Sequence, residues 1–160
     1  MAGKFNIILA GKRQLILDGL KEKINADKHP NIITIETSTR SLVNQIKITF
    51  PDIVIIDQIL FSEMLYTSYQ DVLKKFSPWV KMILITESQT LVNLKYYLQF
   101  GFQSIVLVEN DIDELVTAIR KTKQGEYYFS PEVLKVLIED YTHPRSDTYS
   151  TIFGESKVRI

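Results

Sequence analysis

One stretch of the sequence decides the expected fold: Pro51-Asp52-Ile53-Val54-Ile55-Ile56-Asp57. Its four central residues are all β-branched, and such side chains favour extended backbone. An apolar run without alternation is typical of a strand that is buried on both faces, as in the middle of a parallel sheet. The run ends at Asp57, so the strand delivers a carboxylate to the edge of the sheet. Asp57 is therefore the first candidate functional residue.

Further apolar runs of strand length lie on both sides of this one, and helical patterns separate them. The five runs are Phe5 to Ala10, Ile32 to Thr37, Ile53 to Ile56, Met82 to Ile85 and Ile105 to Val108. This alternation predicts an α/β fold of the flavodoxin-like kind, a three-layer sandwich whose five-stranded parallel sheet has the order 2-1-3-4-5. We expect five helices around the sheet, with a single helix near Val72, Leu73 and Phe76 between the third and fourth strands.

The C-terminal region differs in composition from the rest. We expect one domain over residues 1–124, an extra segment with a sixth helix over 125–141, and a linker over 142–160. Ser130-Pro131 is a helix start, with Ser130 as the N-cap and Pro131 at the first helical position. From Thr142 to Ser150 the residues are mostly polar, as in linkers.

Composition excludes several functional classes. The 160 residues include 19 Lys and Arg against 19 Asp and Glu, so no net positive charge attracts nucleic acid indiscriminately. The chain has no cysteine, which excludes disulfides and thiolate chemistry. No apolar stretch approaches the ~20 residues of a membrane helix, and no signal peptide is recognisable. We therefore expect a cytoplasmic protein without a membrane partner.

Two polar residues follow neighbouring strands of the expected sheet. Ligand sites in such sheets form beyond the carboxyl ends of the strands, where Asp57 and Thr86 both lie. We expect the two side chains to be close together. The alternative is that each residue only caps the loop or helix that follows its strand.

From Phe5 to Lys123 the sequence resembles the receiver domains of two-component response regulators, which have a CheY-like fold. Asp57, at the end of its apolar strand, is similar to the phosphoacceptor of that family. Ile83-Leu84-Ile85-Thr86 resembles the strand that carries its switch threonine, here Thr86. The segment from Gly125 to Tyr141 is similar to the one that follows the receiver in the LuxR/NarL-type subfamily.

The sequence departs from the family pattern at the positions that bind Mg²⁺ and the phosphoryl group in that family. The resemblance implies two acidic residues after the first strand as Mg²⁺ ligands, but Gly11 and Lys12 stand there. The family's lysine after the fifth strand aligns with Val108, and its aromatic switch residue aligns with Ile105. Because Mg²⁺ needs about six oxygen ligands, we expect weak or absent Mg²⁺ binding, no other cofactor and impaired phosphorylation at Asp57.

Lys12 suggests a substitute for the metal. Its ammonium group could pair with the Asp57 carboxylate across neighbouring strands. The alternative is that Lys12 and Arg13 point into solvent at the start of the first helix.

The resemblance implies a regulatory module rather than an enzyme. We expect an atypical receiver that controls a DNA-binding helix-turn-helix domain beyond residue 160, with a sensor histidine kinase as a further partner and DNA contacted only through that output domain. One alternative is a stand-alone adaptor that acts through protein contacts. A second is a flavodoxin-like cofactor protein or enzyme, although the loop from Gly11 to Leu15 lacks the Ser or Thr of a phosphate site.

A helical wheel over residues 91–101 predicts a surface for self-association. Val92, Tyr96 and Phe100 form an apolar stripe nearly opposite the face that packs on the sheet. Exposed apolar stripes mark partner surfaces, so we expect a homodimer through these three residues.

Overall fold

The computed structural model describes residues 5–26, 30–88, 91–109 and 111–143. The strands are β1 (Phe5–Ala10), β2 (Pro30–Glu36), β3 (Ile53–Asp57), β4 (Lys81–Thr86), β5 (Phe102–Leu107) and β6 (Tyr128–Phe129). The helices are α1 (Gln14–Ala26), α2 (Thr39–Thr49), α3 (Gln58–Met64), α4 (Ser68–Phe76), α5 (Leu94–Phe100), α6 (Ile112–Lys123) and α7 (Pro131–Thr142).

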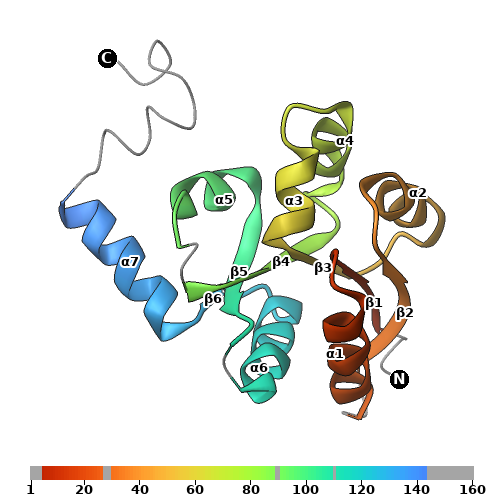
Figure 1. Cartoon of the computed structure of the whole chain (residues 1–160), viewed down its shortest axis with the longest axis horizontal. Helices are drawn as coiled ribbons and strands as arrows, with labels where there is room; N and C mark the ends of the chain where they lie inside the picture. Colours follow the sequence, from red (N-terminus) through yellow and green to blue (C-terminus); the bar gives the residue numbers. More distant parts are fainter. Residues whose placement is uncertain (1–4, 27–29, 89–90, 110, 144–160) are drawn as a thin grey trace.

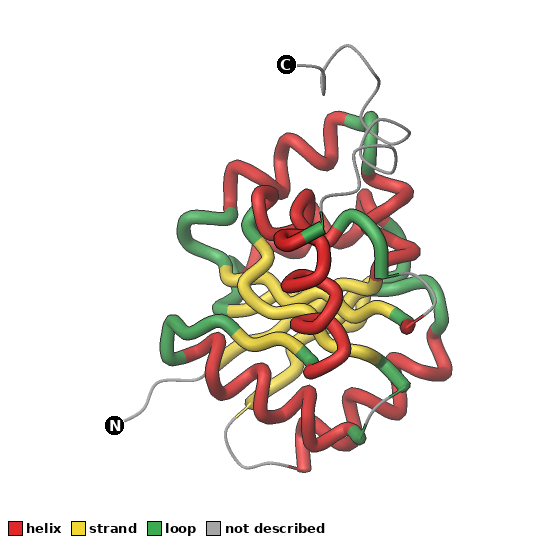
Figure 2. The backbone as a smooth tube through the Cα atoms, turned by 90° about the vertical axis from the view of Figure 1, so that its left-hand side faces the viewer, coloured by secondary structure: helices red, strands yellow, loops and turns green. Residues whose placement is uncertain are grey.

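The strands form one parallel sheet in the order β2-β1-β3-β4-β5-β6. The predicted α/β fold and the order of its first five strands are confirmed, and the short strand β6 extends the sheet by one. Helices α1 and α6 cover one face, and α2, α3, α4 and α5 cover the other (Figure 1). Figure 2 shows the strands between these two helical layers.

The core consists of two clusters because successive strand residues point to opposite faces. Ile8, Val54 and Leu84 face the layer of α2 to α5. Ile7 and Ile55 face α1 and α6. These side chains are fully buried, as the unbroken apolar runs predict.

The number of helices differs from the prediction. Two helices, α3 and α4, lie between β3 and β4, where a single helix was expected. Helix α3 begins directly after β3 and buries Leu60, Phe61 and Met64. The Phe61 ring lies 4.8 Å from the ring of Phe100 and 5.1 Å from that of Phe102. The additional helix therefore fills the space between β3 and α5 with aromatic packing.

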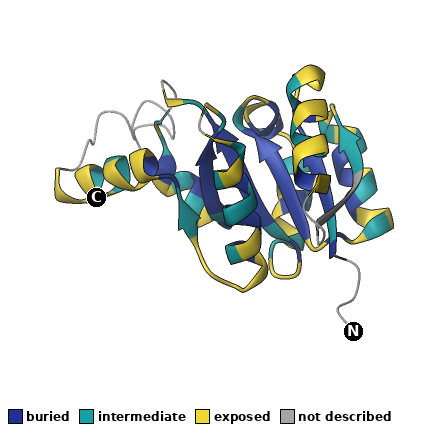
Figure 3. Cartoon of the chain, turned by 90° about the horizontal axis from the view of Figure 1, so that it is seen from below, coloured by how far each residue is buried: buried dark blue, intermediate teal, exposed yellow. Residues whose placement is uncertain are grey.

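Helix α7 starts at Pro131 as predicted, but Ser130 does not cap it with its side chain. The Ser130 hydroxyl is fully buried, donates to the carboxylate of Glu114 and accepts the backbone N–H of Leu107 at 3.0 Å. These bonds attach the base of α7 to α6 and β5. Val133, Val136 and Leu137 pack against the core, and the C-terminal end of the helix projects from the body (Figure 3). Most of the predicted linker, from residue 144 onward, lies outside the described residues.

Candidate functional site

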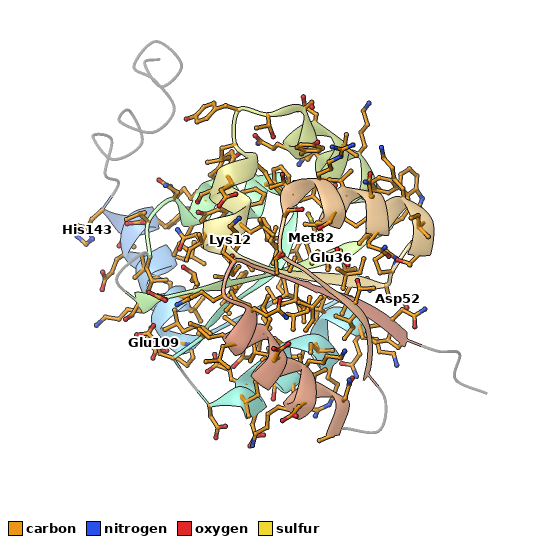
Figure 4. The ribbon with its side chains drawn as sticks, turned by 45° about the vertical axis from the view of Figure 1, so that its right-hand side comes forward. Lys12, Glu36, Asp52, Met82, Glu109 and His143 are labelled. Carbon is orange, nitrogen blue, oxygen red and sulfur yellow. The ribbon has the colours of Figure 1, made fainter. Side chains whose placement is uncertain are left out.

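The candidate site lies at the carboxyl end of the sheet, where the loops after β1, β3, β4 and β5 meet. Lys12 follows β1 and Glu109 follows β5, and both lie away from Asp52, which precedes β3 at the opposite end of the sheet (Figure 4). Parallel strands bring all their carboxyl ends to one edge, so residues far apart in the sequence meet here.

Asp57 is the last residue of β3 and also the N-cap of α3. Its side chain is buried, and its Oδ1 atom accepts the backbone N–H of Leu60 at 2.8 Å. Its Oδ2 atom accepts the backbone N–H of Lys12 at 3.3 Å. A carboxylate at a helix N-terminus is favoured by the unpaired N–H groups and by the helix dipole. Asp57 therefore caps the helix that follows its strand.

Gly11 packs directly against this carboxylate. A Cβ atom at position 11 would lie 2.6 Å from Asp57 Oδ2 and 2.9 Å from its Cγ atom. Both distances are shorter than any normal contact. The Gly11 backbone is also fixed, because its N–H donates to the carbonyl of Glu36 at 3.0 Å. This arrangement leaves no space for the acidic side chain that the family resemblance implies at position 11.

The predicted pairing of Lys12 with Asp57 is wrong. The Lys12 ammonium lies 3.4 Å from Glu63 Oε1 on α3, and both side chains are well exposed, at 39% and 48%. The physical reason is that the Asp57 carboxylate is already bound by two backbone N–H groups inside the fold. Glu63 offers the ammonium group a partner without removing it from water, and such exposed pairs contribute little to stability.

Side-chain contacts that sequence reasoning missed also connect the other loops. Arg13 donates to Glu87 Oε1 at 2.7 Å, which joins the loops after β1 and β4. Ser88 donates its N–H and its hydroxyl to the Glu109 carboxylate at 2.6 and 2.8 Å. These contacts tie the loop after β4 to the loops on both sides of it.

Thr86 is buried at the end of β4, the strand next to that of Asp57, as predicted. Its hydroxyl donates to Gln58 Oε1 at 2.5 Å. The amide nitrogen of Gln58 donates in turn to the phenolic oxygen of Tyr97 on α5 at 3.1 Å. Burial raises the pKa of the Tyr97 phenol above its ordinary value, although the bond from Gln58 acts in the opposite direction. Sequence reasoning missed Gln58 and Tyr97.

Val108 and Ile105 are apolar and pack on opposite faces of the sheet. Ile105 is fully buried on β5. Val108 lines a small cavity of about 20 Å³ together with Leu20, Ile112 and Leu115. Neither residue can supply the charge or the aromatic ring that the resemblance implies at these positions.

The residues present do not fit a magnesium ion. Asp57 is the one carboxylate at the expected position, and both of its oxygens already accept backbone hydrogen bonds. Within the described part of the chain, no group of three or more His, Asp or Glu residues is placed to hold a metal. Mg²⁺ requires about six oxygen ligands in near-octahedral geometry.

The apolar stripe predicted for self-association is not a surface stripe. Phe100 is only 5% exposed, and Tyr96 packs against the core beside Phe61. Val92 is exposed but precedes α5, which begins at Leu94. The reason is that Phe61 of the unexpected helix α3 covers this side of α5.

No protein-family model matches the sequence. Among curated proteins, the transcriptional regulatory protein DegU of Brevibacillus brevis is 22% identical over 138 residues, which are 86% of this chain and 58% of the relative. The response regulator protein VraR of Staphylococcus epidermidis is 20% identical over 146 residues, covering 91% of this chain and 69% of VraR. The chain thus spans only part of the length of these relatives.

Solved structures have the same fold. A LuxR-family two-component response regulator from Aurantimonas sp. SI85-9A1 superposes with a TM-score of 0.75 at 18% identity, over 88% of this chain and 100% of that one. The isolated REC domain of RcsB from Salmonella enterica serovar Typhimurium gives 0.73 at 17% identity, over 84% and 99%. The chain is similar in sequence to response regulators and has the fold of their receiver domains.

Proposed function

We propose that this chain is a regulatory receiver module in which Asp57 serves as a structural anion and not as a phosphoacceptor. One observation carries the proposal: the buried Asp57 carboxylate caps α3 and accepts the Lys12 N–H, while Gly11 packs against it without space for a second acid. The carboxylate therefore has a structural role that requires neither a metal nor a phosphoryl group.

Chemical arguments support the same proposal. Phosphoryl transfer depends on cations that neutralise the oxygens of the transferred group. Near Asp57, the Lys12 ammonium is paired with Glu63 and position 108 is a valine. We infer that the module needs no magnesium and no other cofactor, and that it is not an enzyme.

The output and the partners are proposed from the relatives. DegU is named a transcriptional regulatory protein, and one RcsB structure contains two RcsB dimers bound to DNA. We propose that this chain likewise regulates transcription in the cytoplasm, through a DNA-binding output domain. A sensor kinase and a homodimer remain predictions. A dimer would need a surface other than the buried Phe100 side of α5. No helix in the described residues has the length and apolarity to cross a bilayer.

The decisive experiment is intact-mass spectrometry after incubation with acetyl phosphate and Mg²⁺. We expect an unchanged mass, whereas a receiver with the usual acidic residues, run in parallel, should gain about 80 Da. Asp57→Asn is the matched control. A phosphoryl adduct on the parent that is absent from Asp57→Asn would overturn the proposal. Beryllofluoride, the phosphomimetic used with the RcsB receiver, provides a second test: it should leave the amide NMR spectrum unchanged.

A further inference from the structure

Helix α5 is short, with seven residues, and polar side chains from other helices hold it in place. Gln58 of α3 donates to the Tyr97 hydroxyl at 3.1 Å. Gln70 of α4 donates to the hydroxyl of Tyr96, the preceding residue. Two amide-to-phenol hydrogen bonds from different helices therefore fix neighbouring positions of α5.

The side-chain amides of Gln58 and Gln70 differ in the contact that the Gln58 oxygen makes. The Gln58 oxygen accepts the Thr86 hydroxyl from the end of β4, so this one side chain bridges a strand end and a helix. Thr86 and Tyr97 are only 3% and 4% exposed. A buried hydroxyl that loses its partner is costly, because water cannot replace the bond. The bridge therefore requires Thr86, Gln58 and Tyr97 to keep their relative positions.

The backbone of Gln58 is fixed by the candidate site itself. Gln58 is the first residue of α3 and directly follows Asp57, whose carboxylate holds the start of that helix. A change in the Asp57 cap would therefore act on the first turn of α3, where Gln58 lies. On the neighbouring strand, Ile105 has no polar side-chain atom that could form a second bridge.

We propose that Gln58 is a positioning residue that couples Thr86 to α5. While its amide bridges the two hydroxyl groups, α5 is held in one arrangement. When the amide turns away, Tyr97 loses its donor and α5 opens more often. A ligand or partner that binds one arrangement of Thr86 better than the other would shift α5 in proportion to that difference in affinity. The bridge operates without phosphorylation.

The test is amide hydrogen exchange in α5, measured for single and double variants of the full chain. Thr86→Val removes the hydroxyl that orients the amide, so exchange at residues 94–100 should rise about five-fold, the effect of losing roughly one net hydrogen bond. In a Gln58→Met background, Thr86→Val should cause no further rise. In the matched Gln70→Met background, which loses an amide-to-phenol bond without a link to Thr86, the full five-fold rise should remain.

Exchange in α6 is the internal control and should stay unchanged in all variants. The coupling is refuted if Thr86→Val leaves α5 exchange unchanged, or if its effect is the same in the Gln58→Met background as in the parent. Thr86→Ala removes the same hydroxyl and is the second variant if Thr86→Val does not fold. The inference deepens the proposed function but fails independently of it, because no arm of this test uses phosphate or Mg²⁺.

Discussion

Replacing Gly11 with alanine tests whether Asp57 is fixed in place as the structure indicates. The new Cβ atom would lie 2.6 Å from Asp57 Oδ2 and 2.9 Å from Cγ. The carboxylate cannot yield at low cost, because its two oxygens hold the backbone N–H groups of Leu60 and Lys12. Gly11→Ala must therefore move either the carboxylate or the loop after β1.

The expected cost combines three effects. Forcing an extra methyl group into a packed site costs about 1–3 kcal/mol. Disturbing the N-cap of α3 adds about 0.5–2 kcal/mol. Alanine restricts the unfolded chain, which offsets about 0.4–1 kcal/mol. We expect Gly11→Ala to lower the free energy of unfolding by about 2 kcal/mol.

Urea melts of four variants separate these causes. Gly19→Ala is the matched control: a Cβ at this position within α1 meets nothing within 4 Å, so it should stabilise the protein by about 0.5–1 kcal/mol. In an Asp57→Ala background the clash is absent, and Gly11→Ala should cost almost nothing. A stable Gly11→Ala protein, or effects of Gly11→Ala and Asp57→Ala that simply add, would refute the packing argument.

Two further predictions concern charge. Because burial raises the pKa of Tyr97, the folded state keeps the phenol proton to higher pH than the unfolded chain. The contribution of the protonated phenol to the free energy of unfolding is complete below about pH 10 and is lost above it, by up to about 1.4 kcal/mol per pH unit. Tyr97→Phe should therefore make the decline in stability shallower in melts between about pH 9 and 11. Lys12→Ala should change the free energy of unfolding by less than about 0.5 kcal/mol and show no coupling to Asp57→Ala, since the Lys12 ammonium pairs with exposed Glu63. A coupling energy above about 1 kcal/mol in this double-mutant cycle would contradict the geometry.

The sheet could be predicted because its central strands correspond to uninterrupted apolar runs in the sequence. Ile53 to Ile56 and Met82 to Ile85 are buried on both faces, and the parallel order follows from the helices between them. Helix α3 could not be predicted in the same way. It has only seven residues, and the apolar positions Leu60, Phe61 and Met64 are too few to establish a helical period.

Missing α3 also caused the error in the apolar stripe. A helical wheel assumes that one face of a helix packs on the sheet and the opposite face meets water. Helix α5 instead packs on two sides, because the centroid of the Phe61 ring lies 4.8 Å from that of Phe100 and 6.4 Å from that of Tyr96. Of the aromatic residues interpreted as a partner surface, Phe100 is therefore buried and Tyr96 partly buried within the chain itself.

At the site, the sequence identified the important positions but not their contacts. Asp57 and Thr86 could be placed because strand ends determine which residues meet. The cap on the following helix was one of the alternatives for Asp57, but its second partner, the Lys12 N–H, could not be predicted, because every residue except proline carries such a group. The predicted ion pair with Lys12 is wrong for a related reason: a sequence shows which side chains carry charge, but it does not show that backbone N–H groups bind the Asp57 carboxylate while Lys12 pairs with Glu63.

The substitutions around Asp57 depend on one another. Helix α3 needs the carboxylate as its cap, and the carboxylate can occupy that position because Gly11 has no side chain. Gln58, fixed by the same cap, then holds Thr86 and Tyr97. An acidic residue at position 11 would therefore not simply add a metal ligand, since its Cβ would first displace the cap. The same packing that leaves no space for an acidic residue at position 11 also fixes Gln58 at the start of α3, where its amide contacts Thr86 and Tyr97.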